Sequence, residues 1–175
     1  MIEKSAKVGD SIKLLAKEDG ITNEQMSMKF NVSPQMISHM KNDRRVMQQD
    51  VAHQAINNFD NPEFISDIIY KFSGGYTAPI LNGKNIERHL LALAINAYKE
   101  MAEGMEALRN NLLTKPPEAL NENEMQIVED IFDQVDEGCV WGENFLMVLQ
   151  RVYGISKKKR RRENKPRWKA RGWVQ

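Results

Sequence analysis

This chain of 175 residues has a single cysteine, Cys139, so it cannot form an internal disulfide and offers no group of thiols to a metal ion. Long apolar runs are also missing: no stretch approaches the length of a membrane span. The first ten residues lack the apolar segment of a signal peptide. The sequence therefore predicts a soluble, cytoplasmic protein.

Residues that commonly build catalytic or metal sites are few and scattered. The three histidines (39, 53 and 89) share no metal-ligand spacing, and no paired-carboxylate, Ser-His or Cys-His arrangement stands out. Gly83-Lys84 resembles the end of a phosphate loop, but Ala78 stands where its first glycine would be. Asn85 also replaces the Ser or Thr that would bind magnesium. We therefore expect no enzymatic activity, no cofactor and no metal.

The sequence shows no strand pattern and no internal repeat, and helical spacing of apolar residues runs through most of it. This spacing predicts an all-α fold, with helices over 2–18, 48–59 and 63–72 flanking the segment 21–45. We expect residues 1–72 to form one domain, with 73–85 as a linker. Its predicted core is Val8, Ile12, Leu15, Met26, Phe30, Ile37, Met40, Val51, Ile56 and Phe59.

The segment 21–45 carries the strongest local signals in the chain. Thr22 or Asn23 can cap a first helix, and Asn31 suits the left-handed conformation that ends a helix. Ser33 can cap a second helix, with Pro34 at its first position, where a missing N–H costs nothing. These signals predict two short helices joined by a tight turn.

The second of these helices has one apolar and one polar side. Ile37 and Met40 are expected to face inward. The residues left to face outward are uncharged or basic, and such side chains can bond to base edges or phosphates. A polar second helix after a tight turn is typical of a helix-turn-helix. The outward set is Gln35, Met36, Ser38, His39 and Lys41.

Residues 8–59 resemble the Xre/Cro/repressor family of DNA-binding domains. Three positions depart from the family pattern: Ser27 replaces a small Ala, Asn31 replaces the turn Gly, and Asp43 replaces the Gly that follows Asn42. The resemblance implies a lambda-repressor-like helix-turn-helix domain, and a homodimeric transcriptional regulator of phage or bacterial type. The residues that align with the family pattern, two of these departures among them, are Thr22, Asn23, Glu24, Gln25, Met26, Ser27, Phe30, Asn31, Val32, Ser33, Ile37, Ser38 and Asn42.

On this interpretation the helix over 33–41 enters the major groove of double-stranded DNA. Gln35 is the first candidate for base contact, as a bidentate partner of adenine, and Met36 can meet a thymine methyl group. Asn23 and Asn42 stand where the family contacts phosphate. The complete set predicted to bind DNA is Asn23, Ser33, Gln35, Met36, Ser38, His39, Lys41, Asn42, Arg44 and Arg45.

The second half of the chain predicts a helical region over 86–153. A long helix over 86–113 precedes helices over 121–136 and 142–153, and the three could form a hairpin bundle or mediate dimerisation. Gly104 should weaken the first of them by roughly 1 kcal/mol relative to Ala. Its apolar seam, spaced for coiled-coil or bundle pairing, is Ile86, Leu90, Leu93, Ala97, Met101, Met105, Leu108 and Leu112.

The last segment, 154–175, concentrates positive charge. It holds ten basic residues and one glutamate, a net charge of +9, whereas the rest of the chain has a net charge of −8. Three readings stay open for this tail, which we expect to be flexible: contact with nucleic acid, pairing with the acidic body of the chain, or no partner. Two tryptophans could stack on bases. The tail residues concerned are Lys157, Lys158, Lys159, Arg160, Arg161, Arg162, Lys165, Arg167, Trp168, Lys169 and Arg171, with Trp173.

A function of another class is also open. The helix-turn-helix could serve as a scaffold in a non-enzymatic interaction protein, such as a phage-type factor that binds a host replication, transcription or defence protein. The acidic helices or the basic tail would then be the binding surface. That hypothesis predicts no preferred DNA sequence.

Overall fold

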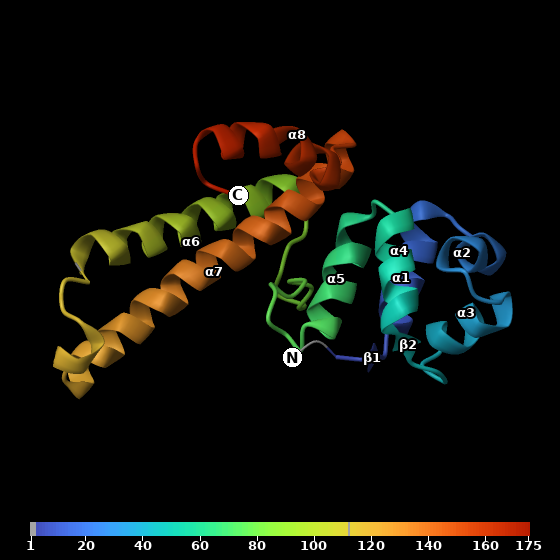
Figure 1. Cartoon of the computed structure of the whole chain (residues 1–175), viewed down its shortest axis with the longest axis horizontal. Helices are drawn as coiled ribbons and strands as arrows, with labels where there is room; N and C mark the ends of the chain where they lie inside the picture. Colours follow the sequence, from blue (N-terminus) through green and yellow to red (C-terminus); the bar gives the residue numbers. More distant parts are fainter. Residues whose placement is uncertain (1–2, 112) are drawn as a thin grey trace. The chain divides into compact units, whose positions relative to one another are not determined.

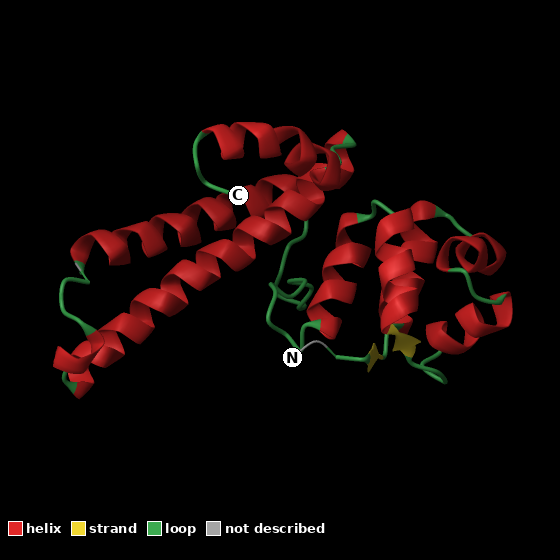
Figure 2. Ribbon diagram, viewed as in Figure 1, coloured by secondary structure: helices red, strands yellow, loops and turns green. Residues whose placement is uncertain are grey.

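The computed structural model describes residues 3–111 and 113–175, and most of these residues are helical (Figure 2). The chain divides into two compact units. Unit 1 combines the residues up to Ile80 with Gln150–Gln175, and unit 2 is Leu81–Leu149. No helix in the described part of the chain combines the length and apolar character needed to cross a membrane.

Unit 1 contains helices α1 (Gly9–Asp19), α2 (Asn23–Phe30), α3 (Pro34–Lys41), α4 (Gln49–Asn58), α5 (Pro62–Phe72) and α8 (Lys157–Ala170) (Figure 1). The all-α expectation missed a small antiparallel sheet of β1 (Ser5–Ala6) and β2 (Met47–Gln48). Ser5 pairs with Gln48, and Ala6 with Met47. Because residues 5 and 6 belong to this sheet, the first helix begins only at Gly9. The helix predicted over 2–18 started too early, and Ile2 lies outside the described residues.

The core of unit 1 is built by α1–α5. Eight of its ten predicted core residues are buried, and the other two, Val51 and Ile56, pack against the core half-buried. Phe30, Phe59 and Phe64 form an aromatic cluster with ring centroids 5.6–6.0 Å apart. Because Phe64, Ile68 and Phe72 of α5 are all buried in this core, α5 is part of the same unit.

Unit 2 is built on two long helices that pack together, α6 (Leu90–Asn110) and α7 (Glu122–Tyr153). The one-turn helix η1 (Pro117–Ala119) lies between them in the chain, and the last four residues of α7 belong to unit 1. Helix α7 is continuous over 32 residues. The helical state predicted over 121–136 and 142–153 is therefore confirmed from Glu122 onward, and the break predicted between the two helices is wrong.

Glycines explain why the break predicted within α7 is absent. They also explain an error in the apolar seam predicted for α6. A Cβ on Gly138 would lie 3.1 Å from Cα of Met101, and one on Gly104 would lie 2.9 Å from the carbonyl oxygen of Gln134. These glycines allow close approach of the two helix backbones and do not end a helix. Since the contact line runs from Leu93 and Ala97 to Gly104, two predicted seam residues further along, Met105 and Leu108, are 67% and 40% exposed. The last one, Leu112, lies outside the described residues.

Candidate nucleic-acid interface

Local hydrogen bonds define both ends of the connection between α2 and α3. Thr22 caps α2 in a reciprocal capping box: its Oγ1 accepts the Gln25 N–H at 3.3 Å, and its own N–H donates to Gln25 Oε1 at 2.9 Å. Asn31 ends α2 in the left-handed conformation, with φ 56° and ψ 46°. Ser33 caps α3 by accepting the Met36 N–H at 3.1 Å, with Pro34 as the first helical residue. The caps and turn predicted for 22–34 are confirmed, and Asn23 is the first residue of α2.

Helix α3 is fixed by its apolar side, because Ile37 and Met40 are almost completely buried in the core. Helical periodicity places Gln35, Ser38, His39 and Asn42 on the opposite side. Gln35 is exposed there, whereas Ser38 and His39 are half-buried. The two remaining residues flank this side: Met36 is 38% exposed, and Lys41 is half-buried.

The chain turns back at the end of α3 and bonds to the last turn of this helix. Both Arg44 and Arg45 donate their backbone N–H groups to the His39 carbonyl, at 2.9 and 3.3 Å. Their exposed side chains are therefore held beside the last turn of α3. The side chain of Asn42 donates to the Ser38 carbonyl at 2.8 Å, so its amide nitrogen is engaged within the helix.

Asp43 follows this turn with φ 54°, a backbone conformation that residues other than glycine rarely adopt. Its carboxylate accepts the backbone N–H of Gly9, the first residue of α1, at 3.0 Å. The residue that departs from the family pattern at this position thus has a role of its own: it connects the end of α3 to the start of α1.

The basic tail, expected to be flexible, forms helix α8. Ser156 caps it by accepting the Lys159 N–H at 3.1 Å. Lys158 donates its ammonium group to the carbonyls of Ile56 and, at 2.5 Å, Phe59, where α4 ends. Because the last carbonyls of a helix carry a partial negative charge, this contact attaches the tail to α4.

Arg151, just before the tail, forms ion pairs that the sequence did not predict. Its guanidinium lies 2.5 Å from Glu18 Oε1 and 3.2 Å from Oε1 of Glu63, a buried carboxylate on α5. The arginine thereby joins the end of α7 to α1 and α5 within unit 1. The only signal in the sequence was the presence of Glu63 beside an apolar run, which does not identify its partner.

The tail tryptophans differ in their surroundings. Trp168 is half-buried, whereas Trp173 is 64% exposed. The Arg171 guanidinium carbon lies 4.9 Å from the centroid of the Trp173 ring, so it covers one face of that ring. Arginine stacking thus leaves one face of Trp173 for any stacking partner.

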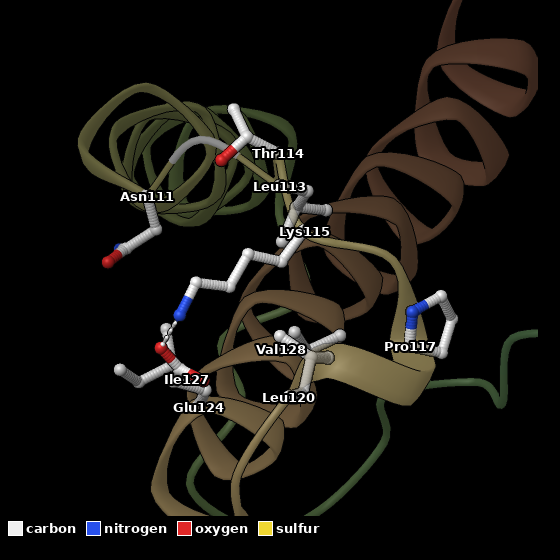
Figure 3. A pocket seen from close by; sticks show the side chains of 9 residues that line it. All are labelled: Asn111, Leu113, Thr114, Lys115, Pro117, Leu120, Glu124, Ile127 and Val128. Atoms are coloured by element: carbon white, nitrogen blue, oxygen red, sulfur yellow. Dashed lines mark hydrogen bonds and ion pairs between the residues drawn. The ribbon is translucent and has the colours of Figure 1, made fainter.

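Unit 2 has a pocket of about 350 Å³ where the chain passes from α6 to α7 (Figure 3). Its lining is mainly apolar, and Lys115 forms an ion pair with Glu124 across it. The hydrogen bond from Lys115, together with one from the Asn121 backbone N–H, holds the pKa of the Glu124 carboxyl below its ordinary value of 4.5. Both contacts fix the start of α7, a structural role.

No group of three or more His, Cys, Asp or Glu side chains in the described residues is arranged to hold a metal ion. Comparison of the chain with protein-family models, with curated proteins and with solved structures gives no significant match. The resemblance to the Xre/Cro/repressor family therefore rests on the sequence pattern of residues 8–59.

Proposed function

We propose that this protein is a non-enzymatic transcriptional regulator that binds double-stranded DNA sequence-specifically through a lambda-repressor-like helix-turn-helix, α2–turn–α3. One observation carries the proposal: Ile37 and Met40 anchor α3 in the core, while its opposite side presents Gln35 and His39. A helix held in this way can enter the major groove without changing its fold.

The parts of this surface take different roles. Gln35 contacts a base, preferably adenine, and Met36, Ser38 and His39 lie beside it. Arg44 and Arg45 contact phosphate, because their side chains are exposed and their backbone is bonded to the end of α3. Ser33, Asn23, Lys41 and Asn42 complete the phosphate contacts. The Asn42 side-chain amide has two N–H donors, and one of them bonds to the Ser38 carbonyl, so the other can donate to a phosphate.

The overall charge of unit 1 supports the proposal. This unit carries twenty basic and eleven acidic residues, a net charge of +9. Unit 2 carries five basic and thirteen acidic residues, a net charge of −8. Attraction to the phosphates therefore favours unit 1 as the DNA-binding part.

Homodimerisation is part of the same proposal, and α6 provides the surface. Exposed apolar residues recur along it at steps of four, three, four and three, the spacing of a helix that pairs with another helix. Helix α6 has a net charge of −1, so two copies repel little there. A dimer sets two α3 helices about 34 Å apart on a near-palindrome. The stripe is Leu91, Ile95, Tyr98, Ala102 and Met105.

Selection of bound sequences from a random duplex pool tests DNA recognition, comparing wild type with Gln35→Ala/His39→Ala. Helix α4 provides a matched control, Gln49→Ala/His53→Ala, because these residues are exposed and have the same spacing. We expect a motif enriched by wild type and by the control variant, and lost or relaxed in the α3 variant. If wild type enriches no motif, or if the α3 variant enriches the same motif as wild type, the proposal is wrong.

The dimer is tested separately by light scattering during size-exclusion chromatography. Ile95→Glu/Tyr98→Glu should convert a dimer to a monomer, because charges would be buried in the paired stripe. Phe132→Glu, on α7 and 68% exposed, is the control and should stay dimeric. Equal molar mass for wild type and the α6 variant would refute pairing through α6.

The second candidate function, a scaffold in an interaction protein, is favoured by α7. This helix carries eight acidic residues and one basic one, and Phe132 projects from it with 68% of its surface exposed. Such a surface suits a partner with a basic, partly apolar patch. This candidate predicts that no duplex motif is enriched and that Phe132→Glu abolishes the protein interaction.

A further inference from the structure

Helix α8 concentrates positive charge beyond what its own contacts neutralise. Residues 157–171 include ten Lys or Arg, and Glu163 is the one acidic residue among them. Glu163 pairs with Arg160 at 2.9 Å and with Lys159 at 4.0 Å. The later basic residues Arg162, Lys165, Arg167 and Lys169 are exposed.

The first turn of α8 is attached to unit 1, whereas most side chains of the rest of the helix are exposed. The Lys158 ammonium group contacts the carbonyls at the end of α4, and the Lys157 N–H donates to Gln150 Oε1 at 3.1 Å. None of the described residues of α8 is buried. The helix thus has a fixed base and an extended cationic surface.

The distribution of charge identifies the kind of partner. Six consecutive basic residues, 157–162, place positive charge on every side of the helix, and α8 has no apolar stripe. Helices that lie on membranes need such a stripe to insert among the lipids. A helix that is cationic all round fits a polyanion, whose phosphates can be reached from several directions.

We propose that α8 is a second nucleic-acid contact, which binds the phosphodiester backbone of duplex DNA without reading its sequence. The contact does not depend on base reading by α3, so an experiment can disprove either proposal without disproving the other. Since α8 is attached to the unit that contains α3, both act on one DNA molecule. The effect of α8 is to strengthen binding to every sequence alike.

The test measures DNA affinity of the full chain by fluorescence anisotropy over a series of salt concentrations. The α8 variant replaces Arg162, Lys165, Arg167 and Lys169 by Gln, which leaves the Lys158 anchor and the Arg160–Glu163 pair in place. The matched control replaces Lys4, Lys7, Lys13 and Lys17 by Gln. These four lysines are exposed in unit 1, and the loss of charge is the same.

The slope of log Kobs against log salt should fall by about 3 to 4 in the α8 variant, because each lost phosphate contact removes about 0.9. Affinity should drop by the same factor for a fixed duplex and for its scrambled version. The lysine control should change the slope by less than about 1. Circular dichroism checks that both variants keep the wild-type helix content.

An unchanged slope in the α8 variant would overturn the proposal, as would an equal decrease in both variants, which would mean that net charge alone matters. Binding of wild type to anionic vesicles that exceeds its binding to duplex DNA, and is lost in the α8 variant, would also overturn it. If the slope falls as expected although selection enriches no motif, α8 is a DNA contact and the proposed sequence reading by α3 is wrong.

Discussion

The carboxylate of Asp43 accepts the backbone N–H of Gly9 at 3.0 Å, across 34 positions of sequence. Val8, the residue before α1, provides no side-chain cap of its own, so Asp43 supplies this bond from the loop after α3. The geometry leaves no space for a side chain at position 9, because a Cβ there would lie 2.7 Å from Asp43 Oδ2 and 2.8 Å from the Lys41 carbonyl. The pair thus fixes the end of α3 against the start of α1.

Substitutions of Asp43 should separate its two roles. Asp43→Ala should lower the free energy of unfolding by about 1–3 kcal/mol, because it removes the bond to Gly9 and leaves Ala at a positive φ. Asp43→Gly should cost less, since Gly adopts that φ without strain. Urea denaturation measures both, with Asp60→Ala, an exposed loop carboxylate, as the control. Equal losses for the Ala and Gly variants would contradict the strain at this position.

The glycines between α6 and α7 provide a second prediction. Gly104→Ala should destabilise the protein by about 1–3 kcal/mol, because overpacking against the Gln134 carbonyl outweighs the gain of roughly 1 kcal/mol in helix propensity. Gly83→Ala is the control, since the nearest atom to its Cβ would lie 3.9 Å away. Denaturant unfolding gives both values. A more stable Gly104→Ala variant would mean that the two helices do not approach as closely as described.

The contact between Lys158 and the end of α4 should control how firmly α8 is held. Lys158→Met should lower stability by about 1–2 kcal/mol and loosen α8, because the last carbonyls of α4 lose their cationic partner. Glutamyl endopeptidase, which cuts after Glu163, should cleave this variant faster than wild type. Lys159→Met serves as the control, because Lys159 is largely exposed and lies 4.0 Å from Glu163. Equal cleavage rates in the two variants would exclude Lys158 as the anchor.

The Glu124 carboxyl should make α7 sensitive to acid. Its pKa is lowered in the folded state, so its contribution to stability is present above the ordinary value of 4.5 and is lost as the pH falls through the lower folded value. Glu124→Gln keeps the capping hydrogen bonds to Asn121 but removes the charge. Unfolding measured between about pH 6 and pH 3 should show a smaller loss of stability in this variant than in wild type. Glu122→Gln, in the same first turn, should follow wild type.

The local features of unit 1 are specified by neighbouring residues in the chain. The caps at Thr22 and Ser33 and the left-handed Asn31 involve partners at most four residues away, so the order of residues alone specifies them. The buried residues of α1–α5 follow from helical spacing in the same way. That Gln35 contacts a base stays a prediction, because recognition depends on a partner that the chain does not encode.

The contacts between distant segments could not be predicted from local sequence patterns and are known from the folded chain. The pairing of β1 with β2, the bond from Gly9 to Asp43 and the attachment of Lys158 to α4 each join residues more than 30 positions apart. The sequence indicates Gly104 as a weak point of its helix, yet α6 and α7 meet there and at Gly138. Such contacts depend on which surfaces the fold brings together, and no spacing along one segment contains that information.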